Sequence, residues 1–338
     1  MTTKHPFRFD NEEDDLDLPD AAHARIRRRD RRRKPRKSRR ASPPPDILER
    51  LRDAADPFEA AVVSTYTPAR HEAGWLMKSL TQFFEEGLLS DVLFHIQGGK
   101  EASVYCCAAG PNVDAEWLAV KVYRPRQHRN LRNDGMYREG RETLSEEGRT
   151  IKQTNHRVMR AVARRSGFGE RVRHQSWLMY EFNALKTLYE DGAAVPKPWS
   201  ASHNAIVMDY IGDEHAAAPS LTRLQLPLTQ AEDLFDQVID TVDIMLQRGL
   251  IHGDLSAYNI LLHEGRAVVI DFPQIVRIGV NRHSRDLFER DLRRVGDYFE
   301  GQGVQCDVEA LIETLWERYT ISHEQLIEPV LPPGWGEP

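Results

Sequence analysis

The chain has 338 residues and 40% hydrophobic content, which is enough to bury one or two hydrophobic cores. It contains no apolar run near the roughly 20 residues that a membrane-spanning helix needs, and its first residues lack the apolar segment of a signal peptide. Its three cysteines have neither the number nor the spacing of a disulfide framework or a metal site. We therefore expect a reduced, cytoplasmic protein without a membrane partner.

The net charge of −6 conceals an uneven distribution. Residues 1–40 hold 14 Lys/Arg and 8 Asp/Glu, and residues 25–40 pack twelve of those basic residues around a single aspartate. Because residues 1–45 combine dense charge with few apolar side chains, we expect a disordered tail. Clustered arginines are typical of arms that bind RNA or another polyanion. A solvated tail without a partner, or one that screens the protein's own acidic surface, has the same composition, and no aromatic residues interleave the arginines to stack on bases.

The first predicted elements are helices, and strands follow them. We assign residues 46–90 to an N-terminal helical segment, with the clearest helical spacing of apolar side chains over residues 74–87. Three strands are predicted next, with the sequences VLFHIQ, ASVYCCAA and WLAVKVYR at residues 92–97, 102–109 and 117–124. Residues 91–212 are therefore expected to form a lobe built on a sheet.

A glycine-containing turn separates the first two strands, and a lysine lies on the third. Glycines allow backbone amides to approach phosphate groups, and the lysine would add a point charge. The residues predicted to contact a nucleotide here are Gly99, Lys100, Ser103, Val104 and Lys121. The turn is not the GxGxxG sequence of ordinary protein kinases. A single lysine at a strand end is also commonly an exposed edge residue, so this segment alone does not establish a phosphate site.

Residues 124–173 carry 14 Lys/Arg against 6 Asp/Glu, with scattered glycines. This composition predicts a long, basic and partly mobile insertion near residues 125–173. Helical spacing of apolar side chains returns over residues 174–190. Glu181 in this helix could pair with Lys121, as a helix glutamate and a strand lysine do in protein kinases. An ordinary solvated glutamate would leave the same sequence.

A further strand is predicted over residues 205–212, running into a hinge. Backbone groups of Asp209 and Ile211 would face an adenine ring, with Met208 at the back of its pocket. A plain buried strand predicts the same residue types, so this assignment depends on the neighbouring motifs.

The most informative stretch is LIHGDLSAYNILLHEGRAVVIDFPQ, residues 250–274. Thr229 and Glu232 have the spacing of a capping box that would open the preceding helix, and Gly249 is placed to end it. Two short apolar runs on either side of a glycine turn predict a hairpin after the loop. Helix, loop, hairpin and aspartate in this order are typical of a kinase C-terminal lobe.

Three polar residues in this stretch point to phosphoryl transfer, a reaction that depends mainly on positioning and charge neutralisation. One aspartate orients the attacking hydroxyl, whereas an asparagine and a second aspartate supply the oxygen ligands that Mg²⁺ prefers. We assign Asp254 as the catalytic base and Asn259 and Asp271 as metal ligands. Taken singly, each could instead be a turn residue, because Asp and Asn favour turns.

These motifs together resemble the RIO family of atypical protein kinases. The resemblance covers about residues 74–301 and rests on GGKEASVY (98–105), AVKVYR (119–124), the Glu181 helix, VMDYIG (207–212), HGDLSAYN (252–259), IDFPQ (270–274) and the helix sequence FERDLRRVGDYF (288–299). It implies an α+β, two-lobed protein-kinase-like fold of the RIO type. The N-lobe would hold an antiparallel sheet and a helix, and residues 213–338 would form a truncated, mainly helical C-lobe.

The resemblance also implies the use of MgATP. Turnover would be either serine/threonine protein phosphorylation or ATP hydrolysis through a phosphorylated aspartate, here Asp271. A role on ribosomal or RNA-containing particles, through residues 25–40 and the insertion, is expected with it. Two features depart from the family: the insertion is long, and no basic C-terminal tail is present.

Two other interpretations stay open. Small-molecule phosphotransferases of the aminoglycoside or choline kinase type also carry HGDLxxxN and IDF motifs, although they build their acceptor pocket from a long C-terminal helical part. Alternatively, the chain is an RNA- or ribosome-binding protein whose nucleotide site acts as a conformational switch.

Overall fold

The structure is a computed structural model that describes residues 64–99, 101–124, 136–137, 139–164 and 166–324. The chain divides into two units, Met1–Ala54 and Ala55–Pro338, and everything below belongs to the second. The tail at residues 1–45, the helical segment before residue 64 and Lys100 lie outside the described residues. The predictions made for them therefore stay predictions.

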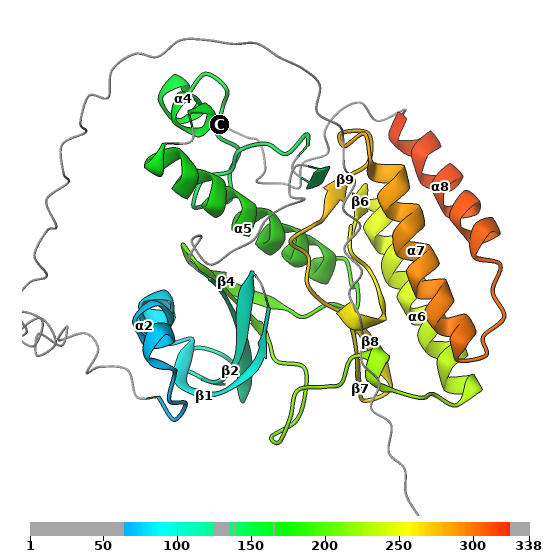
Figure 1. Cartoon of the computed structure of the whole chain (residues 1–338), viewed down its shortest axis with the longest axis horizontal. Helices are drawn as coiled ribbons and strands as arrows, with labels where there is room; N and C mark the ends of the chain where they lie inside the picture. Colours follow the sequence, from blue (N-terminus) through cyan, green and yellow to red (C-terminus); the bar gives the residue numbers. More distant parts are fainter. Residues whose placement is uncertain (1–63, 100, 125–135, 138, 165, 325–338) are drawn as a thin grey trace, which may run out of the picture. The chain divides into compact units, whose positions relative to one another are not determined.

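One antiparallel sheet is the framework of the N-terminal half (Figure 1). Its strands are β1 (Leu89–Gly98), β2 (Ala102–Ala109), β3 (Trp117–Tyr123), β4 (Pro198–Ala201) and β5 (Ala205–Asp209), in the order β1-β2-β3-β5-β4. Each neighbouring pair is antiparallel. The strands expected at residues 92–124 and 205–212 are confirmed. The sequence does not predict β4, a four-residue edge strand that begins with a proline, a residue confined to edges because it cannot donate to a ladder.

Helix α2 (Arg70–Glu85) packs against this sheet. Leu76, Leu80 and Phe83 are fully buried at helical spacing and share a core with Val92 and Leu118 of the sheet. Burying each such side chain stabilises the fold by about 1.5–3 kcal/mol, which fixes the face that the helix presents. The helix begins at residue 70 and not at residue 74. Its start is stabilised because the side chain of Glu72 accepts a hydrogen bond from the backbone N–H of Ala69 (3.2 Å).

Helix α5 (Gly167–Glu190) shares a second core with the sheet, which contains Trp177 and Leu178 of the helix and Tyr123 and Ile206 of strands β3 and β5. The helix predicted over residues 174–190 begins seven residues earlier, at Gly167. The true start is set by Ser166, whose hydroxyl accepts from the backbone N–H of Gly169 (3.1 Å) and caps the helix.

The basic insertion is more regular than its composition predicts. A short helix, α4 (His156–Ala163), precedes α5 and is capped by Asn155. Leu144 and Thr150 form an antiparallel bridge. The expectation that the insertion is partly mobile stays a prediction, but residues 139–164 include a capped helix and a bridge that the arginine-rich composition did not predict.

Three helices form the C-terminal half: α6 (Leu228–Gln247), α7 (Ser284–Gly301) and α8 (Val308–Glu324). They lie side by side (Figure 1) and bury the largest core, to which each contributes apolar side chains. Four short strands lie between α6 and α7: β6 (Leu250–Ile251) pairs with β9 (Val276–Arg277), and β7 (Ile260–His263) pairs with β8 (Arg266–Val269). The second pair is the expected hairpin.

The ends of α6 test the predicted helix signals. The expected capping box at Thr229 and Glu232 is wrong, because the helix begins at Leu228 after Pro227 and has no side-chain cap. Proline supplies the helical φ without a donor to satisfy. The expected stop is confirmed: Gly249 adopts a left-handed φ of 62° and donates to the carbonyl of Leu246 (2.9 Å).

The α+β, protein-kinase-like fold class expected from the sequence is thus confirmed, with an antiparallel sheet and its helices first and a mainly helical part after residue 213. Within the described ranges, no helix is both long and apolar enough to cross a membrane.

Candidate active site

Lys121 on β3 is the meeting point of three parts of the chain. Its ammonium bonds Glu181 of α5 and Asp271 of the loop after β8. Tyr123, two residues further along β3, donates its hydroxyl to the other oxygen of Glu181. The Lys121 and Glu181 side chains are 10% and 3% exposed, so both charges lie in the interior. The pairing of Glu181 with Lys121 predicted from the sequence is confirmed.

The charge state of this lysine follows from its neighbours. Burial alone would lower the pKa of Lys121, but the carboxylates of Asp271 and Glu181 more than offset burial and leave the pKa raised. The ammonium therefore stays charged throughout the neutral range, which the predicted binding of phosphate oxygens would require.

Asp271 has a strained backbone and a partly open side chain. Its φ of 72° lies in the left-handed region, which costs a non-glycine residue about 1–3 kcal/mol and persists only where the surroundings impose it. The side chain is 42% exposed. Burial would raise the pKa of Asp271, yet the nearby ammonium of Lys121, with a smaller effect from His252, lowers it overall. The carboxylate is thus ionised and accessible to a cation.

The loop after β6 holds the other two predicted residues. Asn259 is 4% exposed, and its amide nitrogen donates to the backbone carbonyl of Asp254 (2.9 Å), so the five-residue spacing closes a turn. His252 accepts from the backbone N–H of Asp254 through Nδ1 (3.3 Å), which assigns its proton to Nε2, and that nitrogen lies 3.1 Å from the carbonyl of Ile270. The histidine therefore ties this loop to the residue before Asp271.

Helix α7 supports the same loop from the other side. Asp291, 2% exposed, accepts from the backbone N–H of Gly253 (2.7 Å), and Arg290 donates to the carbonyl of Gly253. Gly253 has a φ of 80°, and a Cβ there would lie 2.4 Å from the carbonyl oxygen of Gln274, so no side chain fits. One turn further along the helix, Arg294 forms an ion pair with Asp254 (2.9 Å).

The glycine turn joins β1 to β2 as expected. Gly98 pairs with Ser103, and Val104 pairs with Lys121 on the neighbouring strand. Gly99 donates its backbone N–H to Ala102 (2.8 Å). The end of β1 also reaches the loop after β6, since Gln97 donates to the hydroxyl of Tyr258. The glycine turn, Lys121 and the aspartate-bearing loops therefore belong to one region.

The predicted hinge leaves one amide available. Asp209 donates its backbone N–H to Lys197 (2.9 Å), and the carbonyl of Ile211 accepts from Ala218 (2.9 Å). Among the described residues, no backbone carbonyl accepts from the amide of Ile211. Met208 lies on β5 opposite Ala119 of β3 and packs against two of the cores.

The donor set fits Mg²⁺. Asn259 and Asp271 offer only oxygen ligands, and the Asn259 amide nitrogen is held by Asp254, which leaves the amide oxygen for a cation. No group of three or more His, Cys, Asp or Glu able to hold a metal occurs in the part of the chain that is described. One or two protein oxygens plus substrate phosphates is nevertheless the usual way to bind Mg²⁺.

Several contacts here were not predicted from the sequence. Arg290, Asp291 and Arg294 of α7 face the loop after β6, and Arg141 of the insertion contacts the loop after Asp271. Of these residues, only Asp291 could have been identified from the sequence. It is a carboxylate on the apolar face of a helix, beside Leu292 and Val295, and such a group needs a buried partner.

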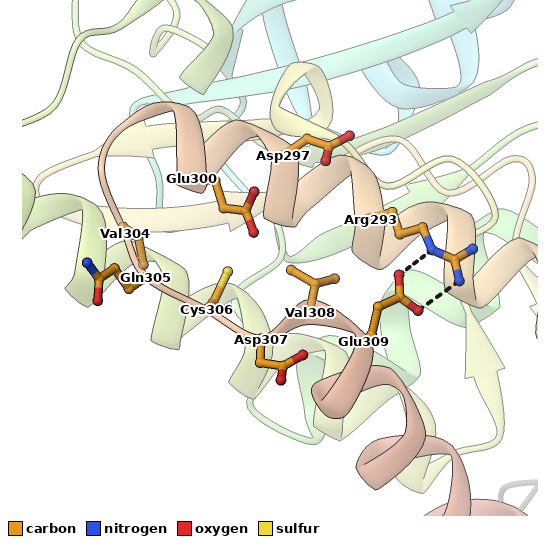
Figure 2. Close-up of a pocket in the computed structure, with 9 residues that line it drawn as sticks. All are labelled: Arg293, Asp297, Glu300, Val304, Gln305, Cys306, Asp307, Val308 and Glu309. Carbon is orange, nitrogen blue, oxygen red and sulfur yellow. Dashed lines mark hydrogen bonds and ion pairs between the residues drawn. The ribbon is translucent and has the colours of Figure 1, made fainter.

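A pocket of about 770 Å³ lies apart from these residues, between α7 and the start of α8 (Figure 2). Arg293 forms two hydrogen bonds with Glu309 on its wall. None of the residues that line this pocket is a predicted site residue. The lining residues are Arg293, Asp297, Glu300, Val304, Gln305, Cys306, Asp307, Val308 and Glu309.

Comparison with known proteins identifies the family. Residues 103–311 match the RIO domain. The RIO-type serine/threonine-protein kinase Rio1 of Haloferax volcanii is 31% identical over 222 residues, which are 64% of this chain and 66% of that protein. The human serine/threonine-protein kinase RIO1 is 27% identical over 281 residues, 82% of this chain and 44% of the relative.

A third relative, the serine/threonine-protein kinase rio2 of Schizosaccharomyces pombe, is 36% identical over 121 residues, which cover 36% of this chain and 33% of that protein. In each of these three comparisons, the match covers less than two thirds of the relative's own length. The RIO-domain match nevertheless includes the strand after the glycine turn, Lys121, both aspartate-bearing loops and α7. The chain therefore belongs to the RIO family.

Proposed function

We propose that the protein is a RIO-type serine/threonine protein kinase or ATPase that uses MgATP. The observation that carries the proposal is Lys121, whose single ammonium bonds both Glu181 and Asp271. It joins the sheet, α5 and the loop after β8 at one charged point, as nucleotide phosphates require. The RIO-domain match favours this proposal over a small-molecule phosphotransferase.

Each residue has a role in this proposal. Gly99, Lys100, Ser103 and Val104 would lie along the phosphates, and Met208, Asp209 and Ile211 along the adenine. Lys121 would bind phosphate oxygens while Glu181 holds it in place. Asn259 and Asp271 would hold Mg²⁺, which neutralises phosphate charge when bound.

Asp254 would orient the acceptor hydroxyl and take its proton. Its ion pair with Arg294 and the loop contacts of His252 and Asn259 support this role, because they fix the carboxylate before the acceptor arrives. In the ATPase alternative, the carboxylate of Asp271 attacks the γ-phosphoryl group, ADP leaves, and water then hydrolyses the acyl phosphate.

The test combines a variant with product chemistry. Asp254→Ala should reduce turnover at least about a hundredfold, the usual scale for a positioned acid–base group, while MgATP binding is kept. The control is Asp240→Ala, an exposed aspartate of α6. Activity of Asp254→Ala within a few-fold of wild type would remove Asp254 from the mechanism.

The label on the protein separates the two forms of turnover. After incubation with γ-labelled ATP, label that resists both acid and hydroxylamine indicates phosphoserine or phosphothreonine. Label released by hydroxylamine indicates an acyl phosphate, which Asp271→Asn should abolish.

We also propose RNA, as part of a ribosomal or other RNA-containing particle, as a partner of the basic segments. Residues 25–40 hold twelve Lys/Arg. Within the insertion, Arg157, Arg160, Arg164 and Arg171 are exposed on or beside α4 and α5. Phe168, 43% exposed at the start of α5, adds the aromatic surface that the tail lacks.

A further inference from the structure

Arg141 lies in the insertion and contacts the loop that follows Asp271. Its Nη2 donates to the carbonyl of Pro273 (3.0 Å) and to the carbonyl of Ile275 (2.6 Å). Loop carbonyls have no ladder partner and need a donor when they are withdrawn from water. A guanidinium is well suited to this, because it carries several donors in a fixed plane.

The arginine is itself held firmly. Its Cζ lies 5.3 Å from the ring centroid of Tyr180, the neighbour of Glu181 on α5. The hydroxyl of Tyr180 accepts from the backbone N–H of Glu142 (2.6 Å), which fixes the segment next to Arg141. Arg141 therefore links the insertion, the helix that carries Glu181 and the loop that carries Asp271.

This placement has an energetic cost. The Nε atom of Arg141 is buried and has no hydrogen-bond partner among the described residues. Burial lowers the pKa of Arg141 to about 10, which still leaves the group charged at neutral pH. A buried cation with an unsatisfied donor destabilises a fold unless its other contacts compensate, and here those contacts are with the loop.

The loop needs external support. Asp271 keeps a left-handed φ of 72°. Trp177 of α5 donates its indole N–H to the same Pro273 carbonyl (3.2 Å), so that this carbonyl is held by two donors from different segments. Pro273 is two positions beyond Asp271, so both donors act on the short segment that carries the Asp271 carboxylate.

We propose that Arg141 is a positioning residue that holds the 271–275 loop in the conformation from which Asp271 binds a cation. The inference rests on the proposed role of Asp271 as a ligand of Mg²⁺. It assigns no contact with nucleotide to Arg141. The competing explanation is that Arg141 stabilises the fold as a whole.

The first readout needs neither nucleotide nor metal. We expect Arg141→Gln to increase amide hydrogen exchange at residues 271–276 about tenfold or more, with the sheet and α6 unchanged. Arg141→Lys keeps one charged donor and should give an intermediate increase. Trp177→Phe removes the second donor to Pro273 and should loosen the same residues. Arg149→Gln, at an exposed arginine of the insertion, is the matched control and should match wild type.

The second readout is ATP affinity with and without Mg²⁺. We expect Arg141→Gln to reduce the gain in ATP affinity that Mg²⁺ provides by about 10- to 100-fold, the range seen when residues supporting metal ligands are removed. The ATP affinity measured without metal should be unchanged.

Two results would overturn the inference. One is wild-type exchange and wild-type Mg²⁺ dependence in Arg141→Gln or, if that variant does not fold, in both Arg141→Lys and Trp177→Phe. The other is a uniform rise in exchange across the fold, which indicates a general structural role. A wild-type protein that binds ATP without any Mg²⁺ dependence would instead contradict the proposed function, whereas the exchange readout would still decide whether Arg141 holds the loop.

Discussion

The charge state of Asp271 is set by its neighbours. It shares an ammonium with Glu181, is partly open to solvent and keeps a strained backbone. Since Lys121 lowers the pKa of Asp271, the side chain is anionic at every pH at which the protein is expected to work.

Asp271→Asn is therefore expected to weaken Mg²⁺-dependent ATP binding. The substitution removes the only carboxylate assigned to the cation, so the loss should be at least about tenfold, the lower limit for residues that merely support ligands. ATP titrated with and without Mg²⁺ into both proteins measures it, with Asp240→Asn as the control. An unchanged Mg²⁺ dependence would show that the cation is held elsewhere.

Asp291 gives a prediction about pH. Burial raises the pKa of this carboxyl, and His252 and Arg290 offset burial only in part. The folded protein thus binds this proton more tightly than the unfolded chain. The tighter binding of this proton contributes to the free energy of unfolding. That contribution is fully present below the unfolded pKa of about 3.9 and is lost as pH rises through the pKa of Asp291 in the folded protein.

Asp291→Asn should remove that dependence, because its amide oxygen can still accept from Gly253 but does not titrate. The free energy of unfolding of wild type minus that of the variant should fall as pH rises from about 4. Urea unfolding of both proteins at several pH values tests this. A difference that is constant or that rises with pH would contradict it.

At the scale of elements, α7 connects the loop after β6 to the rest of the C-terminal half. Arg290, Asp291 and Arg294 contact the loop that holds Asp254, whereas Gly296 allows the start of α8 to approach. A Cβ at Gly296 would lie 2.3 Å from a methyl group of Val308. The small residue therefore sets the distance between the two helices.

Gly296→Ala should destabilise the protein by about 1–3 kcal/mol, the usual cost of overpacking. Gly74→Ala is the matched control, because Gly74 lies inside α2 with nothing within 4 Å of its added Cβ. That change should stabilise by about 0.5–1 kcal/mol, since alanine favours helix. Measuring the free energy of unfolding of both variants tests these two predictions. Equal stabilisation by the two substitutions would mean that α8 moves without cost.

At the scale of the whole molecule, charge is segregated along the sequence. Residues 1–40 and 124–173 are basic, although the complete chain carries −6. Such separation costs self-repulsion within each basic segment, and a partner rich in phosphates would relieve it.

Deleting residues 1–45 should therefore weaken binding to single-stranded RNA and flatten its salt dependence, by about 0.7 in the logarithmic slope for each phosphate that the tail neutralises. ATP turnover without RNA should stay near wild type. A tail of equal length with its Lys/Arg replaced by Ser or Gln controls for length. Unchanged RNA affinity, or crippled basal turnover, would refute a role for the tail in binding RNA.

The sequence by itself determined the elements and the residues whose signals are local. Asp254 and Asn259 are five residues apart and meet within one turn, and the β1–β2 and β7–β8 hairpins follow from short apolar runs around glycine. The pairing of Lys121 with Glu181 spans 60 positions and was predicted through its resemblance to a known arrangement, not through spacing.

Only the tertiary structure decided which of the remaining charged residues support the site. Arg141 and Arg149 belong to the same basic insertion, yet one contacts the Asp271 loop and the other is exposed. Arg294 meets Asp254 across 40 positions. Such partners are selected by the packing of α5 and α7 against the loops, and a composition rich in arginine gives every one of them the same local pattern.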